Sequence, residues 1–183
     1  MLLMGATLCG CNDTSAVSMG SNTALDSADL IAMTDDMSMK IMASPAVQQA
    51  MAEKGKLKVV VQPVVNQMRA EILPKGPAHA FTARVRTLLA THAPDKFTWI
   101  MNRDAFYMLR NQELSGIDLG PSPDAMNPDY ALTATFTSLA DENETGRTSY
   151  YVCTYELTNL MNRTILWSGS YEVQKKAVKG FMD

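Results

Sequence analysis

The stretch LKVVVQPVV, residues 57–65, decides the fold that the rest of the chain builds. It is a short, almost continuous apolar run, rich in β-branched valine. Its length and composition favour a strand that is buried on both faces, as in the interior of a parallel or mixed sheet. Pro63 cannot donate to a neighbouring strand, so we expect the run to end or bulge there.

Helical patterns precede this strand. From Asp26 onward the apolar residues recur at three- and four-residue steps, which predicts a helix with Ser27 or Asp26 as its cap. Pro45 breaks it or begins a second helix, 45–54, which stops at Gly55. Core packing is the favoured interpretation of the methionines here, and a methionine-rich binding groove or a metal–thioether site is the alternative. The apolar positions of the first helix are Leu30, Met33, Met37 and Ile41.

Two further helices flank a second strand. Residues 66–77 are loop-like, and the next apolar stripe predicts an amphipathic helix that Pro94 closes. Residues 97–101 form the strand. Asn102 or Asp104 caps a helix that runs to about Leu114, and residues 115–128 form a loop with three prolines and two glycines. The stripe of the first of these helices comprises Phe81, Val85, Leu88 and Leu89, and the last helix carries Phe106 and Leu109.

The period then changes from about 3.6 to two. Residues 130–136, 151–157 and 165–173 alternate in the manner of half-buried strands, with turns near 141–146 and 162–163. These three strands predict an antiparallel meander. The element order α-α-β-α-β-α-β-β-β indicates an α/β fold: a single-domain sandwich with a mixed four- to five-stranded sheet flanked by helices.

Two of the three cysteines, Cys9 and Cys11, lie near the start of the chain. A disulfide between them has poor geometry, because the bridge needs suitable Cβ directions. A metal site needs about four ligands, and Cys153, His79 and His92 have no ligand-like spacing. A core segment is possible, but residues 12–24 are small and polar, as in a linker. The remaining interpretation is a processed signal.

Leu8-Cys9-Gly10-Cys11 resembles the bacterial lipobox, an apolar residue and two small residues before an obligatory cysteine. The resemblance implies a signal peptide at 1–10, lipidation of Cys11, a flexible linker at 11–25 and a folded α/β domain at 26–183. Asn12 favours sorting to the outer membrane in a Gram-negative cell. A plain cleaved export signal and a cytosolic chain with a chance match are the alternatives.

Composition excludes several function classes. The net charge is −3, whereas nucleic-acid-binding proteins usually have a strongly basic face. No apolar run has the roughly 18–20 residues of a spanning helix. His79, His92 and Cys153 form no nucleophile–base set, and no glycine loop precedes a helix as in phosphate sites. The sequence therefore favours a binding module over an enzyme, with no catalytic residue, metal or cofactor.

Four segments carry a resemblance to a known family. KLKVVVQPVVNQM (56–68) and DKFTWIMNRDAFYMLRNQ (95–112) are similar to the first strand and to the second strand with its following helix in the LpoB family of penicillin-binding-protein activators. PDYALTATFTS (128–138) resembles the next strand, with Ala134 where glycine is usual. YYVCTYELTNLMNRTILWSGSYEVQKK (150–176) resembles the closing hairpin. The resemblance covers roughly Asp26 to Lys176.

The resemblance implies a monomeric outer-membrane lipoprotein facing the periplasm, which binds a bifunctional peptidoglycan synthase and raises its polymerase and crosslinking rates. The linker of about 15 residues has an r.m.s. reach near 20 Å. No motif carries the family's contact residues over, so the partner-binding residues are unknown; loops 66–77 and 115–128 are the candidates. An accessory lipoprotein of curli-export type is the alternative function, and a periplasmic enzyme or ligand binder is a third.

Overall fold

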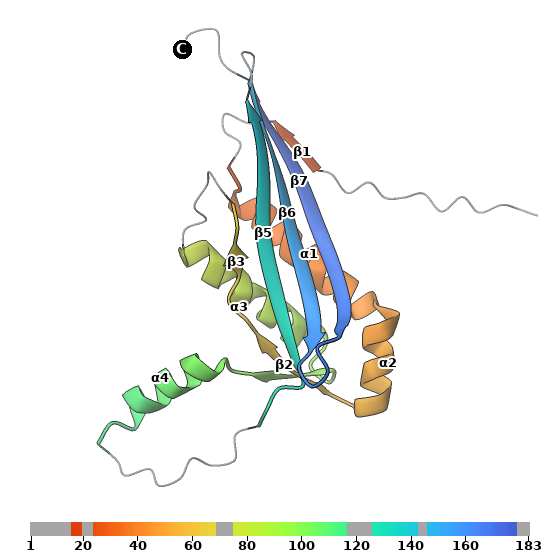
Figure 1. Ribbon diagram of the computed structural model, residues 1–183, viewed down its shortest axis with the longest axis vertical. Helices are drawn as coiled ribbons and strands as arrows, with labels where there is room; N and C mark the ends of the chain where they lie inside the picture. The colour runs from red at the N-terminus through yellow and green to blue at the C-terminus, as the bar shows by residue number, and fades with distance from the viewer. Residues whose placement is uncertain (1–15, 20–23, 69–74, 117–125, 143–145, 179–183) are drawn as a thin grey trace, which may run out of the picture.

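The valine-rich run lies inside a seven-stranded mixed sheet, where Pro63 separates β2 (Leu57–Val61) from β3 (Val65–Asn66). The computed structural model describes residues 16–19, 24–68, 75–116, 126–142 and 146–178. Figure 1 shows a long, twisted sheet with helices packed behind it. Cys9 and Cys11 lie outside the described residues.

The sheet order is β1-β7-β6-β5-β2-β4, and β3 pairs with β5 beside β2. Strand β2 is parallel to both β4 (Phe97–Ile100) and β5 (Tyr130–Glu142). β5, β6 (Gly146–Asn159) and β7 (Ile165–Val178) form the expected antiparallel meander. The predicted α/β class, mixed sheet and closing meander are confirmed.

The sheet has more strands than the four to five that the sequence predicts. One extra strand arises because the run at 57–65 resumes pairing after Pro63: Gln62 N–H donates to Leu132 O and Gln67 N–H to Phe136 O. The other is β1 (Ala16–Met19), which lies within the segment expected to be a linker and pairs parallel to β7. Composition does not reveal such a strand, because the edge of β7 supplies its hydrogen bonds.

Three helices cover one face of the sheet, and they are α1 (Ser27–Ala43), α2 (Pro45–Lys54) and α3 (Lys75–His92) (Figure 1). Asp26 caps α1 through a capping box with Asp29, as one of the two expected caps. Ser44 ends α1 and caps α2, which has Pro45 in its first turn. Helix α3 begins within the segment predicted to be loop-like. The fourth helix, α4 (Arg103–Glu113), projects away from the sheet.

The core lies between these helices and the inner face of the sheet. Met33 and Met37 are completely buried, which confirms that these two methionines fill the core. The hydroxyl of Tyr155 donates to Met33 O across the layers at 3.2 Å. The alternating buried positions of β6 are Ser149, Tyr151, Cys153, Tyr155 and Leu157.

A buried ion cluster joins the start of α1 to β7. Lys175 is 3% exposed, and its Nζ donates to Asp26 Oδ2 at 3.0 Å and to Ala24 O at 2.9 Å. Its Nζ is also ion-paired with Asp29. The same carboxylates form the capping box of α1. The cluster therefore fixes the direction in which the chain enters the helical layer.

Position 169 on β7 is suited to glycine, because the indole of Trp167 lies where a Cβ atom would point. A Cβ atom at position 169 would lie 2.7 Å from Cζ2 of the Trp167 indole. We predict that Gly169→Ala lowers the free energy of unfolding by about 1–3 kcal/mol, because the indole must move or the strand must shift. Urea denaturation measures this. Ser168→Ala, an exposed position on the same strand, should change stability by less than about 0.5 kcal/mol; equal midpoints for the two variants would contradict the packing described here.

Candidate functional site

Helix α4 is held at its first turn and exposed along its length. Asn102 caps it by accepting from the Asp104 N–H at 3.0 Å, and the Asn102 side-chain amide donates to Gln62 Oε1 at 3.0 Å. This second bond ties the start of α4 to the end of β2. No residue of α4 is buried. The exposed apolar side chains of α4 and its C-cap are Phe106, Tyr107, Met108, Leu109 and Leu114.

A groove of about 550 Å³ lies between α4 and the end of the sheet. Its floor comes from β2 and β4, one wall from the first half of α4, and the opposite wall from residues 126–128 with Leu160. This volume is typical of sites that hold a ligand or a partner's side chains. The lining residues with apolar side chains are Val60, Trp99, Ile100, Met101, Phe106, Tyr107, Met126, Pro128 and Leu160, and those with polar side chains are Gln62, Thr98, Asn102, Arg103 and Asn127.

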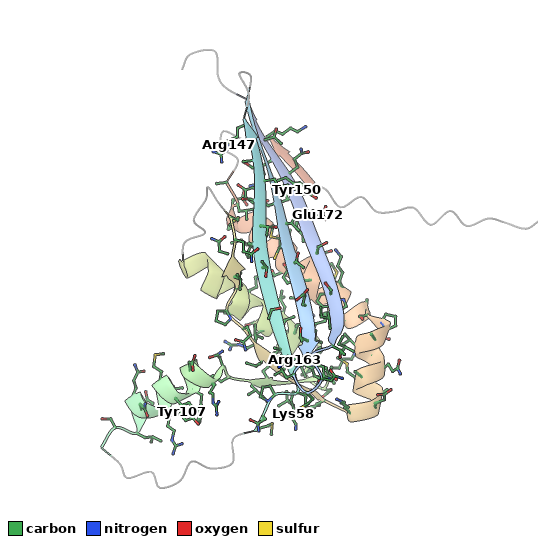
Figure 2. The ribbon with its side chains drawn as sticks, in the orientation of Figure 1. Lys58, Tyr107, Arg147, Tyr150, Arg163 and Glu172 are labelled. Atoms are coloured by element: carbon green, nitrogen blue, oxygen red, sulfur yellow. The ribbon has the colours of Figure 1, made fainter. Side chains whose placement is uncertain are left out.

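Backbone bonds connect the groove's opposite wall to the sheet. The Leu160 N–H donates to Asp129 O at 2.9 Å, and the Asp129 N–H donates to Lys58 O at 3.0 Å. The β6–β7 turn, which contains Arg163, is therefore fixed beside β2. Figure 2 shows Lys58, Tyr107 and Arg163 at this end of the molecule, whereas the bonded pair Tyr150–Glu172 lies toward the other end.

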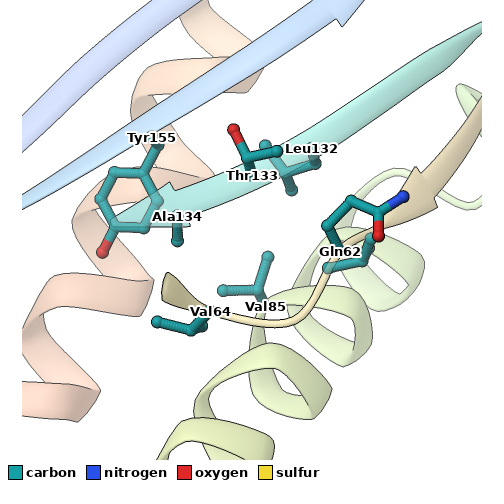
Figure 3. Close-up of a pocket in the computed structure, with 8 residues that line it drawn as sticks. Gln62, Val64, Val85, Leu132, Thr133, Ala134 and Tyr155 are labelled. Carbon is teal, nitrogen blue, oxygen red and sulfur yellow. The ribbon is translucent and has the colours of Figure 1, made fainter. Parts of the chain in front are cut away.

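A second cavity is too small for a ligand (Figure 3). It holds about 10 Å³, which is at the lower limit for one water molecule. It lies between β5 and α3 at the point where Pro63 separates β2 from β3. Its lining comprises Val61, Gln62, Val64, Val85, Leu132, Thr133, Ala134 and Tyr155. We interpret it as a packing gap at the break in the strand.

Cys153, a reactive residue that the sequence singles out, is buried in the core. Burial raises the pKa of the Cys153 thiol to about 12, so the thiol stays protonated at neutral pH. Asp35 pairs with Arg84 at 2.9 Å and Asp36 with Lys40 at 2.6 Å, so both carboxylates of this adjacent pair on α1 have a cation beside them. Among the described residues, no group of three or more histidine, cysteine or acidic side chains is placed to hold a metal ion.

The sequence-predicted site residues are only partly placed. Cys11 and residues 69–74 and 117–125 of the two candidate loops lie outside the described residues. Residues 126–128, from the end of the second loop, do line the groove. Sequence reasoning did not predict that α4 lines a groove, although the cluster Phe106-Tyr107-Met108-Leu109 was a signal: it is more apolar than a solvent-facing helix needs.

Comparison with protein families gives one decisive match. The model of the peptidoglycan-synthase activator LpoB matches residues 29–173, which is well over half of the chain. The chain belongs to the LpoB family. This confirms the resemblance drawn from the four sequence segments, and the family is one of regulatory activators. Comparison with curated proteins gives no match.

Several solved structures are similar to the chain. The LpoB C-terminal domain from Escherichia coli is 20% identical, with a TM-score of 0.49, over 79% of this chain and 98% of that one. The domain from Salmonella enterica is 19% identical, with a TM-score of 0.48 and the same coverage. Lipoprotein GNA1162 from Neisseria meningitidis is 16% identical, with a TM-score of 0.39, over 66% of this chain and 83% of that one.

None of the helices in the described part of the chain is long and apolar enough to cross a bilayer.

Proposed function

We propose that this LpoB-family protein is a lipid-anchored envelope protein that binds a bifunctional, class A penicillin-binding protein and raises its polymerase and crosslinking rates. The observation that carries the proposal is the family match over residues 29–173. It acts through binding, as a regulator of the synthase, and performs no chemistry itself. It regulates cell-wall synthesis from the periplasmic face of the outer membrane.

The anchor is Cys11, lipidated after removal of residues 1–10. Four residues separate Cys11 from Ala16, the first residue of β1. An extended chain spans at most about 3.3–3.6 Å per residue, so this segment reaches about 17 Å. With β1 paired to β7, the domain is held close to the membrane surface. The synthase must therefore extend outward to meet it.

The test of binding uses the full, membrane-extracted chain and the class A synthases of the same cell. We expect the chain to retain a synthase in a pull-down, with a 1:1 complex by mass photometry. Retention of no synthase would contradict the proposal. The free chain should be monomeric in detergent. Stable rings of the free chain would instead indicate the alternative role in envelope assembly or export.

A further inference from the structure

Helix α4 has an apolar surface that nothing in the described part of the chain covers. Phe106 and Tyr107 are 37% and 40% exposed, and no residue of the helix is buried. An isolated helix of this length is marginal in water, since tertiary packing supplies most helical stability. An exposed apolar patch of this kind marks an interaction site. The side of α4 that faces the groove is therefore the candidate interaction surface.

The groove-facing side of α4 combines aromatic and cationic side chains. Arg103, Phe106 and Tyr107 line the groove. Arg110 and Leu114 follow Tyr107 at steps of three and seven residues, which places them along the same side of the helix. Aromatic residues and arginine are the types enriched at the centres of protein–protein interfaces. The floor adds the apolar side chains of Val60 and Ile100.

The charge at the groove favours an acidic partner. Arg103 is the only charged residue among the described residues that line it. Lys58 lies next to the floor, because it pairs in register with Thr98. Within the described residues neither Arg103, Lys58 nor Arg163 has a carboxylate within ion-pair distance. Among the described residues, the neighbouring carboxylates Asp104 and Glu113 on α4 and Asp129 beside Pro128 do not line the groove.

Arg103 is therefore the one charge that the described lining presents to an occupant, and its sign is opposite to that of the net charge of −3 on the whole chain. Charge complementarity therefore points to carboxylates on whatever binds there. The predominance of apolar side chains points to an occupant with apolar anchors, as when a protein segment docks into a groove.

We propose that the groove between α4 and strands β2 and β4 receives a segment of the synthase that carries apolar side chains flanked by acidic ones. The inference rests on the proposed function and adds to it the contact surface and the chemistry of the partner. Phe106 and Tyr107 pack against the apolar side chains of the segment. Arg103 pairs with one of its carboxylates.

The test compares two double variants of the full chain. Arg103→Glu with Phe106→Ser alters the groove side of α4. Met108→Ser with Gln112→Glu alters the opposite side of the same helix and is the matched control. Because α4 has no buried residue, both variants should unfold at the wild-type urea midpoint. We expect the groove variant to bind the synthase roughly 10- to 100-fold more weakly, and the control to bind within about twofold of wild type.

A salt series tests the acidic part of the inference. Wild-type affinity should fall as NaCl is raised from 50 to 500 mM, and the dependence should flatten for Arg103→Glu alone. Affinity independent of salt would overturn the acidic assignment.

The remaining outcomes separate the inference from the proposed function. If the wild-type chain binds no synthase, the proposed function fails. If it binds and the two double variants bind equally well, only the groove assignment fails. A groove variant that loses binding to purified peptidoglycan but keeps the synthase would make the occupant a glycan. One that changes only self-association would make it a second copy. Either result overturns the inference.

Discussion

Lys175→Met should lower the free energy of unfolding by about 3 kcal/mol, although methionine matches the lysine side chain in size. The substitution leaves the carboxylate of Asp29, which is 12% exposed, without its cation. Breaking a buried ion pair by removing one partner costs about 3–5 kcal/mol. We expect the lower end of this range, since Asp26 is 59% exposed and can be hydrated.

Urea denaturation and thermal melting measure this effect. A loss of 3 kcal/mol should lower Tm by about 6–12 °C for a domain of this size. Lys176→Met is the matched control, because Lys176 is the next residue along and is exposed. The control should stay within about 0.5 kcal/mol of wild type. If the two variants unfold at the same midpoint, the ion cluster does not hold α1 against β7.

The pH dependence of stability gives a second readout of the same cluster. The hydrogen bond from the Asp29 N–H, and then that to Lys175, hold the pKa of Asp26 below its ordinary value of 3.8. The stability that the Asp26 carboxylate contributes is therefore present above pH 3.8 and is lost as pH falls through the lowered pKa. Burial alone would lower the pKa of Lys175, but its bonds to Asp29 and Asp26 outweigh burial and raise it above 10.5.

The contribution of Lys175 is fully present below pH 10.5 and is lost as pH rises through the raised pKa. Lys175→Met should remove this alkaline loss. The loss of stability at acid pH should only become smaller, since the hydrogen bond from the Asp29 N–H to the Asp26 carboxylate remains. A variant whose stability still falls above pH 10.5 as steeply as that of wild type would contradict the assignment.

Cys11→Ala should release the protein from membranes entirely. If Cys11 carries the lipid, its acyl chains supply the anchor at about 0.8 kcal/mol per buried CH₂, and the variant has no thiol to accept them. Fractionation and intact mass measure the result: wild type in the membrane fraction with a lipid adduct on Cys11, and the variant in the soluble fraction without one.

Cys9→Ala is the control for the anchor, because alanine is also small and position 9 precedes the expected cleavage site. This variant should be processed, lipidated and retained by the membrane as wild type is. An unmodified Cys11 in the wild-type chain would contradict the anchoring proposal.

The fold could be predicted from the sequence where local signals carry the information. The capping box at Asp26, Pro45 after Ser44, and the change of period at residue 130 each act within a few residues. Strand β1 could not be predicted, because its four residues are stabilised by pairing with β7, over 150 residues later. Pro63 indicated a break, but only pairing with β5 shows that the strand resumes.

The candidate site was harder to predict than the fold. The apolar cluster at residues 106–109 is equally consistent with a core helix, and only the three-dimensional arrangement shows that α4 has no buried residue. For Lys175 the sequence suggests an exposed residue, and the structure shows a buried one. In sequence it is part of a basic tail, yet β7 turns it inward to meet two carboxylates from the start of α1. The exposure of α4 and the burial of Lys175 both depend on which distant elements pack against these residues. The periodicity of the sequence carries no information about that packing.

The most direct measurement of the central claim is the rate of glycan polymerisation by the purified class A synthase, with and without the full chain. We predict that saturating wild-type chain raises the initial rate severalfold. The Met108→Ser, Gln112→Glu control should do the same, and the Arg103→Glu, Phe106→Ser variant should need a much higher concentration. An initial rate unchanged at saturating wild-type chain would contradict the account.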